Sequence, residues 1–148
     1  MNPHAEAPPD PRAAAAIRFF EQLSADDVQW MGRHYTEQAF FKDPFNEVRD
    51  LIGVQRIFAH MFEALDAPRF EVLDCLVQNQ QCFLTWDFSF RLKGQTQQRH
   101  IHGSSHLRFA ADGRIAYHRD YWDAAEEFYE KLPLLGSVLR LIKRRLKV

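Results

Sequence analysis

The fold is decided by residues 82–92, which read CFLTWDFSFRL. Apolar side chains occupy every second position from Cys82 to Leu92, and four of the five positions between them are polar. Because side chains alternate between the two faces of a strand, this period of two predicts an antiparallel strand with one buried face. The predicted buried face carries Leu84, Trp86, Phe88, Phe90 and Leu92.

Further strand patterns lie on both sides of this segment. Phe70 opens an earlier strand, and a turn at residues 93–95 leads to a later one. That later strand is predicted to place on one face Ile101, Gly103, Ser105, Leu107 and Phe109. Asp112-Gly113 predicts a tight hairpin, because glycine accepts the positive φ of a short turn, and residues 115–122 then form the last long strand.

Helical spacing dominates the first half of the chain. Residues 11–23 predict a helix with Pro11 in its first turn, and a short second helix follows Ser24. A strand is predicted over residues 35–42, and a helix follows Gly53 and stops before Pro68. Helices first and long strands afterwards predict an α+β domain, in which a curved sheet wraps around the helices.

Length and composition suit one compact domain. The chain has 148 residues, of which 46% are hydrophobic, and a formal net charge of -1. No basic face of the kind that binds nucleic acid is evident. Cys75 and Cys82 do not have a zinc spacing, and we see neither a signal peptide nor a membrane-spanning run, so we expect free thiols in a reduced, cytoplasmic setting.

The two ends of the chain differ from the domain between them. Residues 1–11 are rich in proline and poor in apolar side chains, which predicts a disordered leader before a domain over residues 12–133. Residues 134–148 combine leucines at helical spacing with five basic residues and no acid, which predicts a basic amphipathic helix. This helix has three candidate roles: packing on the domain or its dimer, covering a pocket, or peripheral membrane contact.

Two carboxylates lie among bulky aromatic residues and are therefore candidates for proton transfer. Asp43 lies within Phe41-Lys42-Asp43-Pro44-Phe45, and Asp120 lies within His118-Arg119-Asp120-Tyr121-Trp122. His118 shares a strand face with Asp120 and can orient it or shuttle its proton. Each acid has a structural alternative: Asp43 before proline commonly forms an Asx turn, and Asp120 can be a buried ion-pair partner.

The chain resembles the nuclear transport factor 2-like superfamily, in particular its ketosteroid isomerase and SnoaL-like polyketide cyclase branches, over about residues 13–128. The motifs that carry the resemblance are residues 42–45 followed by Gly53 and a helix, residues 107–109 before 112–115, and the closing Tyr121-Trp122. The resemblance implies a cone-shaped barrel: a strongly bent, mixed or antiparallel sheet wrapped around N-terminal helices, with a deep apolar pocket.

The resemblance carries over unevenly at individual positions. Asp43 falls on the position of the isomerase's general base, but Phe19 replaces its oxyanion-hole tyrosine and Ser105 replaces its protonated aspartic acid. Loss of these donors argues against steroid isomerisation. SnoaL-like cyclases carry an acid on the last strand with a histidine nearby, and Asp120 with His118 resembles this pair.

Aromatic residues are numerous enough to line a ligand cavity as well as a core, with thirteen Phe, four Tyr and three Trp. An entirely structural role for the aromatic stripe is the alternative. The predicted ligand-binding residues are Phe19, Phe41, Phe58, Phe62, Trp86, Phe88, Phe90, Ser105 and Trp122.

His100, His102 and His106 alternate along one strand. Their spacing suggests a metal site, but no carboxylate or cysteine near them in the sequence completes one, so no metal is predicted. The resemblance places this face on the outside of the sheet, where such proteins often form dimers. We therefore expect a homodimer through the outer face.

These observations lead to one main hypothesis and two alternatives. The main hypothesis is a SnoaL-like, cofactor-independent acid/base enzyme of the cyclase, isomerase or hydratase type, or a binding protein, whose ligand is a hydrophobic small molecule. Asp120 is the expected proton acceptor, with His118 tuning it and Asp43 as a second acid/base. The alternatives are a ketosteroid isomerase-like reaction at Asp43 and a non-catalytic carrier or interaction module.

Overall fold

A computed structural model describes residues 10–127 and 133–147. Residues 1–9 of the predicted leader and Val148 of the predicted tail lie outside the described residues. The elements are α1 Pro11–Gln22, the 3-10 helix η1 Ala25–Arg33, β1 Tyr35–Lys42, β2 Glu47–Val48, α2 Leu51–Ala64, β3 Leu65–Gln78, β4 Gln81–Leu92, β5 Arg99–Phe109, β6 Ile115–Trp122, α3 Ala124–Glu127 and α4 Pro133–Leu146.

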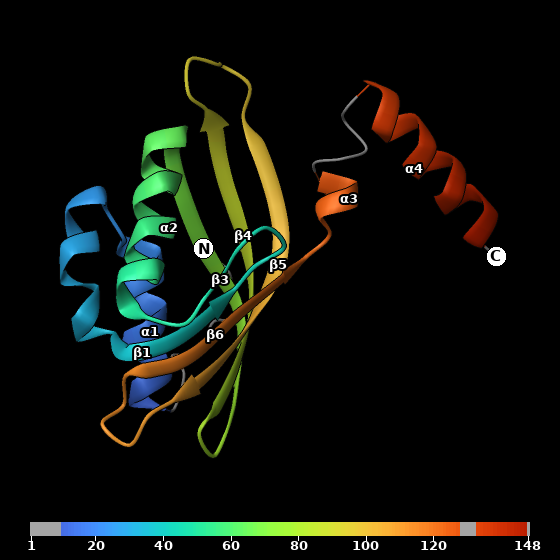
Figure 1. The fold of residues 1–148 in the computed structure, drawn as a ribbon. Helices are drawn as coiled ribbons and strands as arrows, with labels where there is room; N and C mark the ends of the chain where they lie inside the picture. The colour runs from blue at the N-terminus through green and yellow to red at the C-terminus, as the bar shows by residue number, and fades with distance from the viewer. Residues whose placement is uncertain (1–9, 128–132, 148) are drawn as a thin grey trace.

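The strands form one curled sheet in the order β2-β1-β6-β5-β4-β3. The β1 and β6 pair is parallel, and the other neighbouring pairs are antiparallel. The helices α1 and α2 lie against the concave side of this sheet (Figure 1). The predicted α+β fold is confirmed, and the sheet that was expected as a barrel is open, with β2 and β3 as its edges.

The start of α1 is set by Asp10 and Pro11. The Asp10 carboxylate accepts a hydrogen bond from the backbone N–H of Arg12 at 2.8 Å, and Pro11 occupies the first turn, where no N–H donor is needed. The Arg12 side chain also donates to Asp10 and lowers the pKa of that carboxyl to about 2. The helix buries Ala13, Ala16, Phe19 and Phe20 against the sheet.

The strand β3 begins earlier than its sequence indicates. We expected it to open at Phe70, but it begins at Leu65 directly after α2 and passes through Pro68. The pairing with β4 is irregular between Asp66 and Arg69, and Ala67 has a φ of 49°. A bulge of this kind accommodates the missing N–H of a proline, which explains why Pro68 did not mark the boundary.

The alternation predicted for β4 is present in the structure, and it centres on Trp86. Cys82, Leu84, Trp86, Phe88 and Phe90 are all buried. Trp86 pairs with Gly103 of β5, and a Cβ atom placed on Gly103 would lie only 2.5 Å from Cη2 of the indole. Gly103 therefore makes the space in which the indole lies against the backbone of β5.

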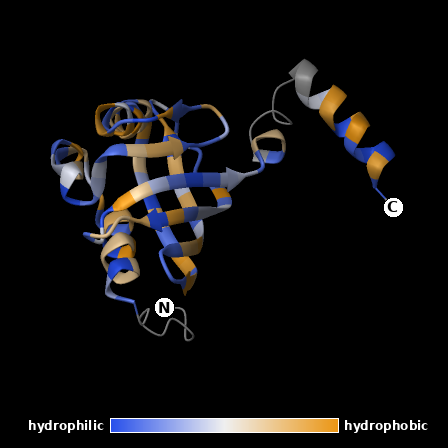
Figure 2. Cartoon of the chain, turned by 60° about the horizontal axis from the view of Figure 1, so that its bottom comes forward, coloured by the Kyte–Doolittle hydropathy of each residue, from blue (hydrophilic) through white to orange (hydrophobic). Residues whose placement is uncertain are grey.

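The C-terminal helix α4 stands beyond the end of β6 and away from the sheet (Figure 1). Its apolar side chains Val138, Leu141, Ile142 and Leu146 are exposed, and Figure 2 shows the hydrophobic and hydrophilic positions alternating along it. Lys143 approaches Glu126 of α3 at 3.9 Å. Within the described ranges, every helix is too short or too polar to cross a bilayer.

Substituting Gly103 by alanine tests the packing of the indole. We expect Gly103→Ala to lower the free energy of unfolding by about 1–3 kcal/mol, because the added methyl group overlaps Trp86 and forces either the ring or β5 to move. Urea unfolding measures this change. Ser104→Ala, one position along on the opposite face, is the matched control, and an unchanged midpoint for Gly103→Ala would contradict the packing described here.

Candidate active site

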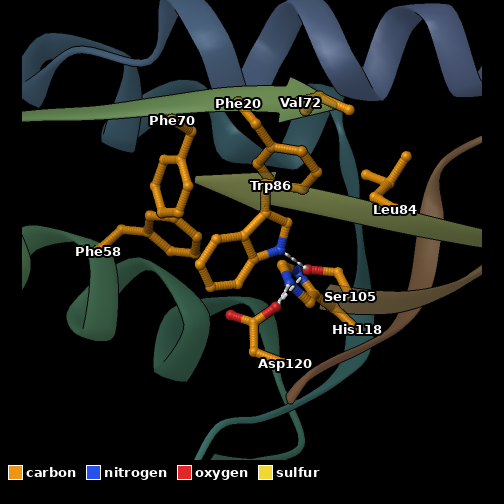
Figure 3. Close-up of a pocket in the computed structure, with 9 residues that line it drawn as sticks. All are labelled: Phe20, Phe58, Phe70, Val72, Leu84, Trp86, Ser105, His118 and Asp120. Atoms are coloured by element: carbon orange, nitrogen blue, oxygen red, sulfur yellow. Dashed lines mark hydrogen bonds and ion pairs between the residues drawn. The ribbon is translucent and has the colours of Figure 1, made fainter. Parts of the chain in front are cut away.

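An inner pocket lies between the helices and the concave face of the sheet (Figure 3). Its volume is about 20 Å³, enough for one water molecule. Aromatic and aliphatic side chains from α1, α2, β3 and β4 form most of its wall, and three polar residues from β5 and β6 close it. The lining residues are Phe20, Phe58, Phe70, Val72, Leu84, Trp86, Ser105, His118 and Asp120.

A larger outer pocket of about 480 Å³ adjoins the inner one. The two pockets share Phe58, Phe70, Trp86 and Asp120, so Asp120 stands where they meet. Most of the outer wall is apolar, and its volume falls within the range usual for small-molecule sites. Its polar lining residues are Asp43, Asn46, His60, Arg99, His100 and Asp120.

A chain of hydrogen bonds runs through the wall of the inner pocket. Tyr35 Oη contacts His118 Nδ1 at 2.7 Å, and His118 Nε2 contacts Asp120 Oδ1 at 2.6 Å. Ser105 Oγ donates to the same Asp120 oxygen at 2.5 Å, and Trp86 Nε1 donates to Ser105 Oγ at 2.8 Å. The chain thus joins four neighbouring strands of the sheet, β1, β6, β5 and β4.

The donors and acceptors of this chain determine where its protons lie. The Trp86 N–H can only donate, so the Ser105 hydroxyl accepts from it and gives its own proton to Asp120. With Asp120 ionised, His118 donates from Nε2 and its Nδ1 accepts from the Tyr35 hydroxyl. In this tautomer of His118, every hydrogen bond of the chain has one donor and one acceptor.

The second carboxylate oxygen of Asp120 is available to a ligand. Within the part of the chain that the structure describes, Oδ2 has no hydrogen-bond partner, while Oδ1 accepts both donors. Figure 3 shows the two oxygens pointing in different directions, with only one of them in the network. The Asp120 side chain is 16% exposed, and the residue also borders an open surface pocket between Lys42 and Trp122.

Aromatic rings keep bulk water away from His118. Its ring centroid lies 4.7 Å from that of Phe41 and 5.4 Å from that of Phe20, both in edge-on contacts. Tyr35 is fully buried, and this burial, together with the charge of Asp120, raises its pKa well above the ordinary value of 10.0. Tyr35 therefore keeps its proton at physiological pH and acts as a donor to His118.

Asp43 lies at the rim of the outer pocket and forms an Asx turn. Its Oδ1 accepts from the backbone N–H groups of Phe45 at 2.8 Å and Asn46 at 2.7 Å. The turn explains the Asp-Pro-Phe-Asn sequence by local geometry. Asp43 and Asp120 both line the outer pocket, so the two acids face one cavity, and a catalytic role for Asp43 stays a prediction.

The aromatic residues predicted to bind ligand are distributed unevenly. Phe41, Phe58, Trp86, Phe88, Phe90 and Trp122 line the pockets. Phe19 and Phe62 line neither of them: Phe19 stacks on His34, with ring centroids 4.1 Å apart, and its neighbour Phe20 faces the inner pocket instead.

Sequence reasoning missed several residues of the site. Tyr35, Phe20, Phe70 and Arg99 were not named as candidates. Only Phe70 could have been found from the sequence. It lies two positions before Val72, so the two side chains share one face of the strand.

The histidines of β5 have their own partners. His102 contacts Asp87 at 2.7 Å, and His106 contacts Gln81 at 2.9 Å. His100 was expected on the outer face of the sheet, but it also lines the outer pocket. Across residues 10–127 and 133–147, no group of three His, Cys, Asp or Glu side chains could hold a metal ion. Cys75 and Cys82 are free thiols with sulfur atoms 3.8 Å apart.

Comparison with known proteins gives matches to a domain family and to solved structures. The family model for the SnoaL-like domain matches residues 16–118. No curated protein sequence matches this chain.

Three solved structures illustrate the likeness of fold. A protein from Catenulispora acidiphila with a ketosteroid isomerase-like fold is 9% identical, with a TM-score of 0.68 and coverage of 79% of this chain and 88% of that one. A protein from Jannaschia sp. CCS1 assigned to the SnoaL-like polyketide cyclases is 16% identical, with a TM-score of 0.68 and coverage of 78% and 87%. An LEH-like epoxide hydrolase from M. tuberculosis is 13% identical, with a TM-score of 0.64 and coverage of 90% and 93%.

Replacing Tyr35 by phenylalanine tests the proton arrangement. We expect Tyr35→Phe to lower the free energy of unfolding by about 1–3 kcal/mol at neutral pH, because His118 Nδ1 loses its donor inside the core. Above pH 10.0, Tyr35 ionises in the unfolded wild type but stays neutral in the folded state, so the free energy of unfolding of wild type falls. We therefore expect the difference in free energy of unfolding between wild type and Tyr35→Phe to shrink above pH 10.0.

Urea unfolding at neutral and alkaline pH measures both effects, and Tyr117→Phe, a tyrosine stacked on Phe40, is the control. A Tyr35→Phe variant with wild-type stability at neutral pH would show that the hydroxyl does not hold His118 in place.

Proposed function

This chain belongs to the SnoaL-like domain family, and we propose that it is an acid/base enzyme acting on a hydrophobic small molecule in the outer pocket. The observation that carries the proposal is Asp120, a largely buried residue of the outer-pocket wall with one carboxylate oxygen held by two donors and the other without a partner among the described residues. Asp120 Oδ2 takes a proton from a carbon next to a carbonyl group of the ligand. Alternatively, it takes a proton from a water molecule that attacks the ligand.

The neighbours of Asp120 support a role as base. Ser105 and His118 both contact Oδ1, so that oxygen is occupied and Oδ2 is left for the ligand. The same donors hold the carboxyl group in one orientation, so that Oδ2 does not need to find its position during the reaction. His118 and Tyr35 are positioning residues in this scheme, because neither lines the outer pocket.

A hydratase or hydrolase reaction has specific support. The inner pocket has room for one water molecule, and Asp120 forms part of its wall. A base beside such a water is the arrangement needed to add water to a ligand in the outer pocket. Hydration or hydrolysis is therefore the second candidate reaction.

The ketosteroid isomerase-like alternative has weaker support. Phe19 supplies no hydroxyl, and the Ser105 hydroxyl already donates to Asp120. The two donors with which the isomerase stabilises its enolate are therefore missing from these positions, and an enolate formed by Asp120 would need another donor, such as His60 or Arg99 of the pocket wall. A non-catalytic carrier remains the alternative from another class, and it requires no proton transfer by Asp120.

Two reactions of defined probes test the proposal. We expect the wild-type protein to accelerate the exchange of the α-hydrogens of β-tetralone for deuterium in heavy water, or the hydrolysis of styrene oxide, measured by mass spectrometry. Asp120→Asn should lower the rate of whichever reaction the wild type accelerates by about 10²- to 10⁴-fold, because the amide cannot accept the proton. The variant should still bind the probe. Asp43→Asn tests the predicted second acid/base at the rim of the same pocket, and Asn46→Ala, also in that wall, is the control.

The outcomes separate the three hypotheses. A rate lost in Asp43→Asn and kept in Asp120→Asn would support the ketosteroid isomerase-like alternative. Probe binding without acceleration of either reaction would support a carrier and contradict the enzymatic proposal.

The homodimer through the outer face of the sheet stays a prediction, as does the cytoplasmic setting. A row of stacked rings supports such an interface: Phe83 lies on His106, His106 contacts Tyr117, and Tyr117 lies on Phe40. Phe83 is 49% exposed although it is a large apolar residue.

The helix α4 has the composition of a membrane-surface helix, and we infer that it binds anionic lipid surfaces. Its exposed apolar side chains and its basic residues occupy largely different sides of the helix, with Arg145 near the C-terminal end as the exception. A long arginine side chain at a helix end can reach the headgroups from such a position. The helix also lies beyond residues 16–118, so it is an addition to the matched domain.

Vesicle binding tests this role of α4. We expect the full chain to bind vesicles containing phosphatidylserine more tightly than vesicles of phosphatidylcholine alone. The double variant Arg144→Gln, Lys147→Gln should bind about thirtyfold more weakly, at about 1 kcal/mol for each basic residue. The control double variant removes two exposed arginines of the domain, Arg56→Gln and Arg69→Gln. Equal binding to both kinds of vesicle would contradict the inference.

A further inference from the structure

Arg99 lines the outer pocket and forms no hydrogen bond or ion pair within the described residues. Its Nε atom is buried, and within the described residues it has no hydrogen-bond partner. The guanidinium has further N–H donors on its two terminal nitrogens, and these are the groups that a ligand in the pocket can reach. We propose that the outer pocket binds an elongated apolar ligand that carries a carboxylate, and that this carboxylate pairs with Arg99. This inference names the ligand class of the function proposed above and rests on it for the reacting end.

Among residues 10–127 and 133–147, no carboxylate forms an ion pair or hydrogen bond with Arg99. Residues 88–111 contain neither Asp nor Glu, so β5 and the adjoining end of β4 are uniformly basic or neutral. Asp66 lies on the neighbouring end of β3, opposite Arg91, and Lys93 approaches it at 3.9 Å.

The remaining titratable groups of the pocket do not replace that partner. His60 and His100 also line the pocket, and neither can provide a negative charge. Two acids line the pocket. Asp120 lies on β6, far from Arg99, and Asp43 lies at the rim.

The register of the sheet separates Arg99 from the base. Ser105 pairs with Asp120 across β5 and β6, and Arg99 lies six positions before Ser105 on the same face of β5. Six residues of strand span about 20 Å. A ligand that contacts both residues is therefore elongated, with an apolar middle along Phe88 and Trp86, which line the pocket between them.

Electrostatics sets the direction of such a ligand. A carboxylate is repelled by Asp43 and Asp120 and attracted by Arg99, so the uncharged end of the ligand faces Asp120 Oδ2. The guanidinium group matches a carboxylate with two parallel N–H donors. We favour a carboxylate over a phosphate because a doubly charged group loses more hydration in a pocket whose wall is mostly apolar.

The experiment compares two probes that differ in one group, dodecanoate and dodecanol, at neutral pH. Their binding is measured by calorimetry and by the fluorescence of the tryptophans that line the pocket, Trp86 and Trp122. We expect wild type to bind dodecanoate at least about tenfold more tightly than dodecanol, because only the carboxylate forms charge-assisted hydrogen bonds. Arg99→Gln should abolish this preference while leaving dodecanol binding unchanged, and Arg99→Lys should keep part of it.

The controls separate this inference from general charge effects and from the proposed reaction. Arg108→Gln removes an exposed arginine of the same strand and should keep the preference for dodecanoate. Asp120→Asn should also keep it, even though that variant loses turnover, so the two hypotheses fail in different measurements. Equal affinity of wild type for the two probes, absence of dodecanoate binding, or a preference that survives Arg99→Gln would each overturn the proposal.

Discussion

The structure depends on how the charge of Asp120 is accommodated inside an apolar interior. A buried carboxylate is stable only when donors replace the water that it loses. Ser105 and His118 provide these donors, and each is held in turn, Ser105 by Trp86 and His118 by Tyr35. Because these residues come from neighbouring strands, the curvature of the sheet and the geometry of the network determine each other.

The aromatic residues of the chain serve both the core and the pocket. Trp86 illustrates the double role, since its ring packs on Gly103 while its N–H begins the hydrogen-bond chain. The space that remains is a water-sized inner pocket joined to a larger apolar one. Asp120 lies where they meet, which places its carboxylate beside walls that are mostly apolar.

Much of the fold and half of the site are visible in local patterns. The alternation of residues 82–92 and the Asp112-Gly113 turn predict the long strands, and parity along the last strand places His118 beside Asp120. These predictions succeed because the period of a strand depends on the backbone alone. Parity fails where a bulge or a helix decides the facing, as at Pro68 in β3.

By itself, then, the sequence determined the α+β class, the order of the long helices and strands, and the two acids worth testing. Only the tertiary structure decided which of Phe19 and Phe20 faces the pocket, that Tyr35 holds His118, and that Arg99 lacks an acceptor. The physical reason is that hydrogen-bond partners and pocket walls come from residues distant in the chain. Tyr35 and His118 are 83 positions apart, and nothing local to either residue specifies their contact.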